Sequence, residues 1–226
     1  MVPGFLDVTV KFADCIYKIF AHKPTLRNCT NKSKASIRVL RLTQRTLVLQ
    51  SGSQTNTPGF SAYSFVYPRD SEKWGPARAQ PGYGGLPFLS EVFSTPKTRI
   101  LPLEAPKGVD SDRFSAYAAY QEDKLSKLVL INMHPYYANS TDDFSVDVKI
   151  PVCGRSQHSR TIVKRLTTPS IDEKDSSKVL WAGQSFRHGD AEGEVDIEEV
   201  GRDCVITLRG SEAVIVFFDE KSVYGL

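Results

Sequence analysis

Residues 114–137 constrain the fold of this chain more than any other stretch, because two β-rich segments flank a short charged turn. Residues 114–121 alternate between two faces, which is the period-two pattern of a half-buried strand. After the polar residues 122–124, residues 125–133 are almost continuously apolar, as in a strand that is covered on both faces. The sequence therefore predicts a β-hairpin that enters the core of a sandwich.

Apolar runs recur at short intervals from Arg99 onward, between clusters of Pro, Gly, Asp and Ser. This spacing is typical of an all-β sandwich or barrel and predicts about nine strands. In one of them, Phe144, Val146, Val148 and Ile150 are expected to share a face, and the final apolar run is expected to lie centrally. The predicted strands cover residues 100–103, 114–120, 125–133, 144–150, 161–166, 179–182, 195–199, 204–208 and 213–218.

Upstream of these strands the pattern changes. One short helix is expected over residues 82–94, where Leu86, Leu89, Val92 and Phe93 recur at helical spacing after a glycine-rich turn. Residues 63–67 are predicted to form an isolated strand. The polar run at 50–57 predicts a linker, and residues 1–60 as a whole fit no clear pattern and are expected to be poorly ordered.

Charge is distributed unevenly along the chain. The formal net charge is +3, yet residues 1–60 alone carry nine basic and two acidic side chains, or +7, which leaves −4 for the rest. The basic residues are spread singly and accompany no RNA-binding or zinc motif, so nucleic acid is not expected as a partner. No apolar stretch is long enough to span a bilayer, and no signal peptide is visible. Neither a membrane partner nor a localisation is predicted.

The chain has four cysteines and four histidines, which are the residue types that form disulfides and bind metal ions. The four cysteines match no metal motif, and neither do His22, His134, His158 and His188, so neither a metal nor another cofactor is predicted. Cys153 and Cys204 both lie in the β-rich part and are the candidate disulfide, although two buried free thiols are the more common outcome.

No pair of carboxylates is spaced for glycosidase-type catalysis, which uses two acids from different strand ends. The acidic pairs at 142–143, 172–173 and 198–199 are adjacent in sequence, and solvated surface positions are the simpler interpretation. Glu91 on the predicted helix is a weaker acid/base candidate, since such a residue usually lies at the rim of a helix packed on a sheet. No catalytic residue is assigned.

Aromatic side chains suggest a second kind of site, because sugar rings stack on tyrosine and tryptophan faces. Tyr117, Tyr136, Tyr137 and Trp181 are candidates, with Tyr136, Tyr137 and Trp181 retained as carbohydrate contacts; packing in the core or at an edge is the commoner use of such residues. Three sequons begin at Asn28, Asn31 and Asn139 and would be glycosylated only in the secretory pathway. Asn139, in a loop between strands, is the most credible.

Four segments in this order resemble the C-terminal portion of family 79 glycoside hydrolases, the β-glucuronidase and heparanase-like group, especially its fungal members. They are PGYGGLPFLSEVFS, FSAYAAYQEDKLSKLVLINMHPYY, TIVKRLTTPSIDEKDSSKVLWAGQSF and SEAVIVFF. The resemblance covers roughly residues 60–226. It implies a (β/α)₈ barrel followed by a β-sandwich, with catalytic glutamates on the fourth and seventh barrel strands. No residue of this chain matches either glutamate.

The resemblance divides the chain into three parts. Residues 1–60 have no counterpart, residues 61–97 correspond to the last barrel strand and helix, and residues 98–226 correspond to the complete antiparallel sandwich. The expected function is a non-catalytic domain that braces a (β/α)₈ catalytic barrel. The alternatives are a carbohydrate-binding module with a glycan partner, a domain that docks on a separate barrel subunit, and a truncated gene model of a full hydrolase.

Overall fold

The structure is a computed structural model and describes residues 65–67, 72, 75–95, 97–150, 153 and 160–218. All strand pairs in it are antiparallel, so the predicted mainly-β, antiparallel fold is confirmed. The predictions for residues 1–60, including the sequons at Asn28 and Asn31, lie outside the described residues.

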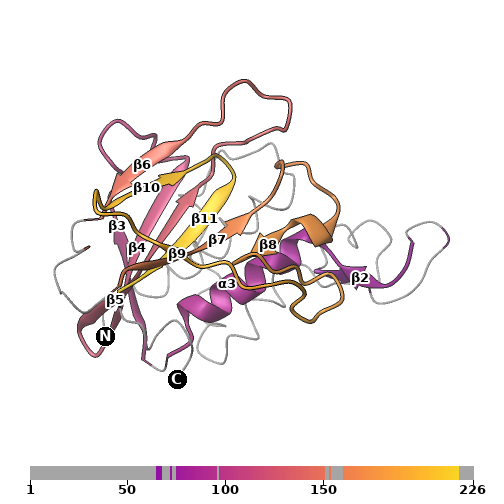
Figure 1. The fold of residues 1–226 in the computed structure, drawn as a ribbon, viewed down its shortest axis with the longest axis horizontal. Coiled ribbons are helices and arrows are strands. Elements are labelled where there is room, and N and C mark those ends of the chain that lie inside the picture. Colours follow the sequence, from indigo (N-terminus) through magenta and orange to yellow (C-terminus); the bar gives the residue numbers. More distant parts are fainter. Residues whose placement is uncertain are drawn as a thin grey trace, which may run out of the picture.

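A seven-stranded sheet forms the middle of the domain (Figure 1). Its strand order is β3-β4-β5-β11-β7-β8, and β9 also pairs with β7. The bounds are β3 Arg99–Leu103, β4 Phe114–Gln121, β5 Lys124–Asn132, β7 Ile162–Thr167, β8 Leu180–Trp181, β9 Glu198–Glu199 and β11 Glu212–Phe217. β11 lies between β5 and β7 and all six of its residues are buried, as its apolar sequence predicts.

The predicted hairpin is β4–β5, and its two-residue turn is unusual in composition. Gln121 pairs with Lys124, so Glu122 and Asp123 form the loop, with φ values of +47° and +63°. Positive φ at both central residues is the geometry that matches the right-handed twist of a tight hairpin, although Asn-Gly is the usual sequence.

Two layers cover the opposite faces of the central sheet. On one face lies a two-stranded sheet of β6 (Val146–Lys149) and β10 (Val205–Leu208). On the other face lies the helix α3 (Gly85–Val92), preceded by the short 3₁₀ helix η2 (Pro81–Gly84), as Figure 1 shows. A further pair, β1 (Val66–Tyr67) and β2 (Arg78–Ala79), lies upstream, and a second 3₁₀ helix, η3 (Ser176–Lys178), precedes β8.

The layers enclose two hydrophobic cores, one on each side of the sheet. Phe114, Ala116 and Ala118 of β4 face the β6–β10 core, whereas Tyr117 and Ala119 of the same strand face the α3 core. The predicted alternation of β4 is therefore correct, but the strand is not half-buried, because both of its faces are covered. A half-buried pattern was expected because alanine and serine leave the second face weakly apolar in sequence.

One local prediction is corrected. Phe144 does not belong to the alternating strand: it has a φ of +49° and its ring stacks on His134, so β6 starts at Val146. The short helix expected over residues 82–94 is present as α3. Its buried residues are Gly85, Phe88 and Val92, while Leu86, Leu89 and Phe93 remain partly open.

Candidate functional site

The sheet face beneath α3 carries the most specific set of contacts in the described part of the chain. We call it the helix-docking face, and define it as the β5, β7 and β11 side chains that point toward α3. Most of them are apolar and fully buried, but two are lysines. Its members are Lys127, Val129, Ile131, Ile162, Lys164, Leu166, Ala213, Ile215 and Phe217.

Lys127 of β5 is bound to the end of the helix. Only 1% of the residue is exposed, and its Nζ donates hydrogen bonds to the Glu91 carbonyl oxygen at 2.5 Å and to Ser94 Oγ at 2.8 Å. The last carbonyls of a helix have no partner within the helix, and a cation there also meets the negative end of the helix dipole. Lys127 therefore caps α3 from the sheet below it.

The protonation of Lys127 reflects this environment. Burial, which disfavours the charged amine, is the main cause that lowers the pKa of Lys127 from 10.5 to about 8, while the Glu91 carboxylate opposes the shift and Lys164 adds to it. At neutral pH the Lys127 amine is charged, and burying this charge lowers the stability of the folded chain.

Lys164 of β7 pairs with the side chain of the same helical residue. Its Nζ forms a short ion pair with Glu91 Oε1, and the two side chains are 11% and 18% exposed. Both lysine Nζ atoms also lie over the Phe217 ring, at 5.6 Å for Lys127 and 5.5 Å for Lys164 from its centroid. Glu91 thus contacts both lysines, one through its carboxylate and one through its carbonyl. Glu91, the weak acid/base candidate from the sequence, therefore makes contacts that hold α3 on the sheet.

The N-terminal end of the helix makes the complementary apolar contact. The Phe88 ring meets the Trp181 ring edge to face, with centroids 5.1 Å apart. At Gly84 an added Cβ would lie 2.8 Å from Cγ1 of Val179, the residue before β8, so the close approach of η2 to this side chain favours glycine.

A second charged cluster lies on the opposite face of β7 and connects this strand to β9, β10 and β11. Arg165 donates to both carboxylate oxygens of Glu198, at 2.6 and 3.0 Å, and to Glu212 Oε2 at 3.3 Å. It also donates to the Thr207 carbonyl oxygen of β10 at 2.9 Å. The bidentate contact strengthens the pairing of β9 with β7, and the hydrogen bond to Thr207 holds β10 on the central sheet.

The four aromatic candidates are not brought together. Trp181 is only 4% exposed and Tyr117 only 7%, and both belong to the α3 core. Tyr136 is half-buried beneath the Arg209 guanidinium, whose Cζ lies 4.3 Å from the ring centroid. Tyr137 is 52% exposed. Of the carbohydrate contacts predicted from sequence, Tyr137 therefore presents the most open ring.

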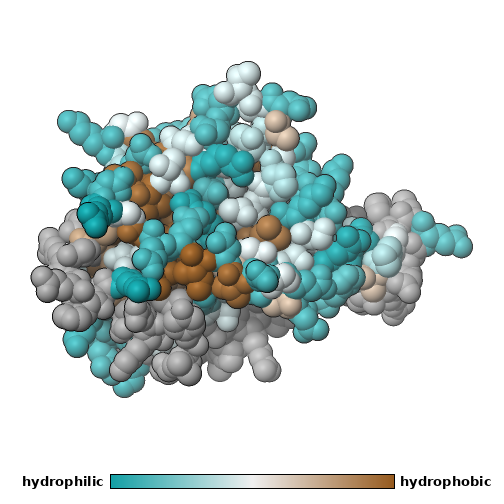
Figure 2. Space-filling model, viewed as in Figure 1, coloured by the Kyte–Doolittle hydropathy of each residue, from teal (hydrophilic) through white to brown (hydrophobic). Residues whose placement is uncertain are grey.

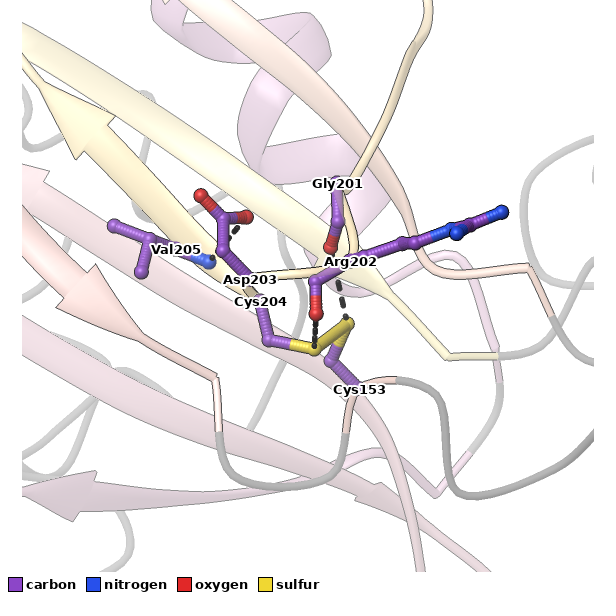
Figure 3. The surroundings of a disulfide bond; sticks show 6 residues. All are labelled: Cys153, Gly201, Arg202, Asp203, Cys204 and Val205. Atoms are coloured by element: carbon purple, nitrogen blue, oxygen red, sulfur yellow. Dashed lines mark hydrogen bonds between the residues drawn. A yellow bond between two sulfur atoms is a disulfide. The ribbon is translucent and has the colours of Figure 1, made fainter.

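The candidate disulfide and the candidate glycosylation site both lie in loops. The structure joins Cys153, after β6, to Cys204, before β10, with their Cα atoms 5.7 Å apart (Figure 3). The two cysteines are 51 positions apart in sequence, and Cys153 packs against the β6–β10 core. Asn139 is exposed in the turn after β5.

Other acidic residues serve local structure. Asp142 and Asp143 accept hydrogen bonds from the backbone N–H groups of Phe144 and Ser145. Among the described residues, no group of three or more His, Cys, Asp or Glu side chains is placed to hold a metal ion. Within the same residues, no helix has the length and apolar character needed to cross a membrane.

A shallow hollow of about 420 Å³ runs along β3 and β4 at the edge of the sheet. Its lining mixes apolar residues such as Leu103 and Val109 with polar ones such as Glu104 and Ser111. Tyr136, Tyr137 and Trp181 do not line it, so it does not unite the predicted carbohydrate contacts.

The buried lysines Lys127 and Lys164 are not among the site residues predicted from the sequence. A signal for both was present. Lys164 lies between Ile162 and Leu166, and Lys127 precedes Val129 by two residues, and these apolar neighbours all point into the α3 core. A lysine at such a position needs a partner from the covering layer, and Glu91 is the acidic residue of the only helix expected there.

Residues 116–215 match the family model of the glycosyl hydrolase family 79 C-terminal beta domain. No curated protein matches the chain.

Among solved structures, a 4-O-α-L-rhamnosyl-β-D-glucuronidase from Fusarium oxysporum 12S is similar. It has 25% identity and a TM-score of 0.41, and the match covers 53% of this chain and 26% of that chain. The α-L-arabinofuranosidase from Thermotoga maritima has 15% identity, a TM-score of 0.38, and coverage of 69% and 31%. A family 51 α-L-arabinofuranosidase from Thermotoga petrophila RKU-1 has 16% identity and a TM-score of 0.38, and the match covers 69% of this chain and 31% of that chain. This chain thus spans about a quarter to a third of the length of these structures.

Proposed function

Residues 116–215 form a C-terminal β domain of glycosyl hydrolase family 79, and we propose that this domain braces a (β/α)₈ catalytic barrel. In this proposal, residues 98–226 are the bracing sandwich and residues 61–97 supply the last strand and helix of the barrel. Residues 1–60 receive no role.

The observation that carries the proposal is the attachment of α3 to the helix-docking face. The helix is held at its C-terminal end by Lys127 and Lys164, and along its length by the buried Phe88 and Val92. A large apolar interface with fixed polar contacts makes two units move as one. A barrel that ends in α3 would therefore be joined rigidly to the sheet.

The apolar side of α3 is broader than its buried part. Leu86, Leu89 and Phe93 adjoin Phe88 and Val92 on the helix and remain partly open, and Leu89 and Phe93 pack against the edge of the same core. Figure 2 shows apolar patches in the middle of the face seen in this view, among mostly hydrophilic surface. The partly open side chains along α3 leave apolar area that the rest of a barrel would cover.

We further propose that the chain alone does not hydrolyse glycosides. In this proposal, two glutamates of the barrel carry out catalysis. The carboxylates described above instead contact lysine, arginine or backbone groups. Turnover of an aryl β-glucuronide by the purified, folded chain would contradict this.

The carbohydrate-binding alternative has less support. It requires an open aromatic platform, yet Trp181 is packed against Phe88 and Tyr136 lies under Arg209. For the alternative that the gene encodes a full hydrolase, the genomic DNA upstream of the codon for Ser61 can be searched for an in-frame barrel with two strand-end glutamates.

A fragment-complementation experiment tests the bracing role. The Fusarium oxysporum enzyme is truncated just before the segment that corresponds to residues 61–97, and this barrel fragment is co-expressed with the full chain. We expect a one-to-one complex in size-exclusion chromatography with light scattering. As a matched control, the substitution Phe88→Ala removes the main apolar contact of α3 and should weaken the complex. Separate elution of two folded components would contradict the proposal.

A further inference from the structure

The turn after β5 places a glycosylation sequon beside an open aromatic ring. The sequon is Asn139-Ser140-Thr141, and Tyr137 precedes its asparagine by two residues. The Ser140 N–H donates to the Tyr137 carbonyl oxygen at 2.8 Å, so Tyr137 and Asn139 are the first and third residues of one β-turn. Both side chains are exposed, and the Asn139 carboxamide has no hydrogen-bond partner in the described part of the chain.

The backbone on both sides of this turn is fixed. Before it, the Tyr136 N–H donates to Ser211 Oγ at 3.0 Å, and the Tyr136 carbonyl oxygen accepts from the Ile171 N–H at 2.8 Å. After it, Ser140 Oγ donates to the Asp142 carbonyl oxygen at 2.7 Å. The turn is thus presented on an anchored loop, while its outward side chains remain accessible to a modifying enzyme.

The exposed Tyr137 ring offers a contact for the first sugar of a glycan. Tyrosine has an apolar face of the kind that packs against sugar rings, and 52% of Tyr137 is exposed. A sugar on Asn139 would begin within the same turn, so stacking needs no rearrangement of the backbone. The aromatic residue that the sequence suggests as a glycan contact is then a contact for a glycan on this same chain.

The disulfide between Cys153 and Cys204 is independent support for the compartment in which this modification takes place. Disulfides form and persist in oxidising environments such as the lumen of the endoplasmic reticulum, and N-linked glycans are attached to asparagine sequons of secreted proteins.

We propose that Asn139 is an N-linked glycosylation site and that the first N-acetylglucosamine packs on the Tyr137 ring. The donor is a lipid-diphosphate-linked oligosaccharide. A bond forms between Asn139 Nδ2 and C1 of the first sugar, while the bond from C1 to the diphosphate oxygen breaks. The diphosphate leaves with the bonding electron pair, Nδ2 loses one proton, and nothing is oxidised or reduced.

Occupancy is tested with the full chain secreted from a eukaryotic host behind a cleavable leader. Peptide N-glycosidase F in H₂¹⁸O converts a glycosylated asparagine to ¹⁸O-labelled aspartate, which mass spectrometry locates. We expect the label at Asn139, its loss from that peptide in Thr141→Ala, and its retention in Thr141→Ser. A Ser140→Ala variant, which keeps the sequon, is the matched control and should remain labelled. A folded, disulfide-bonded chain without label at Asn139 would overturn the site.

The stacking contact is tested separately by a double-mutant cycle on melting temperature. Loss of the glycan in Asn139→Gln should lower the melting temperature by about 2–4 °C when residue 137 is Tyr, as expected for the loss of one aromatic contact. The same loss is expected in the Tyr137→Phe background, and almost none in Tyr137→Ala. An equal effect of Asn139→Gln in all three backgrounds would overturn the contact with Tyr137.

Discussion

Glu91 of α3 and Lys164 of β7 form an ion pair on a sheet face that is otherwise mostly apolar. The two residues are 73 positions apart in sequence, so the pair joins the helix to the middle of the sandwich. Because water is largely excluded, either charge without the other would be strongly unfavourable.

Glu91→Gln should therefore lower the free energy of unfolding by about 3 kcal/mol, since it leaves the Lys164 amine without its counter-charge. Urea denaturation of the wild type and the variant measures the loss. The double variant Glu91→Gln/Lys164→Met serves as the control, because it removes both charges and should be less destabilised than the sum of the two single variants. Additive losses would show that the pair is not coupled.

The lowered pKa of Lys127 predicts a pH dependence of stability. Between pH 8 and about pH 10.5 the unfolded chain binds a proton at Lys127 that the folded chain does not, so stability contributed by this residue rises with pH. Below pH 8 both states are protonated and the cost of burying the charge is constant. Relative to Lys127→Met, the wild type should gain about 3 kcal/mol across this range. Chemical denaturation at several pH values tests this, and parallel curves for the two proteins would contradict it.

Gly84→Ala should destabilise the chain by about 1–3 kcal/mol through overpacking against Val179, even though Gly84 has helical dihedral angles that alanine readily adopts. Gly82→Ala in the same 3₁₀ helix is the control, because its added Cβ would meet Phe65 at an ordinary 3.6 Å. Thermal unfolding of both variants distinguishes them. The additional change Val179→Ala should restore part of the stability, and failure to do so would exclude this contact as the cause.

Removal of the cross-link between Cys153 and Cys204 should cost about 2–4 kcal/mol, because the disulfide closes a long loop and restricts the unfolded chain. Urea denaturation with and without dithiothreitol measures this for the wild type. The variant Cys153→Ser/Cys204→Ser should have the stability of the reduced wild type and should not respond to reductant. A response of that variant would mean that other cysteines account for the effect.

The sequence was sufficient for the strand pattern but not for the contacts of the docking face. Strands such as β5 and β11 are recognisable because their apolar runs are bounded by turn residues. The burial of Lys127 and Lys164 depends on a helix from another part of the chain, and lysine considered alone is expected on the surface. In the same way, Trp181 is covered by Phe88, which lies far from it in sequence, so its exposure could not be judged locally.

The thermal inactivation of a family 79 barrel tests the bracing role most directly. The barrel fragment of the Fusarium oxysporum enzyme described above is incubated at raised temperature with the chain or with an unrelated folded protein at equal concentration. Its remaining activity on its own substrate is then followed over time. A brace should lengthen the half-life of the barrel, and the chain with Phe88→Ala should lengthen it less. An unchanged half-life in the presence of a stable complex would show that the domain docks on the barrel without bracing it.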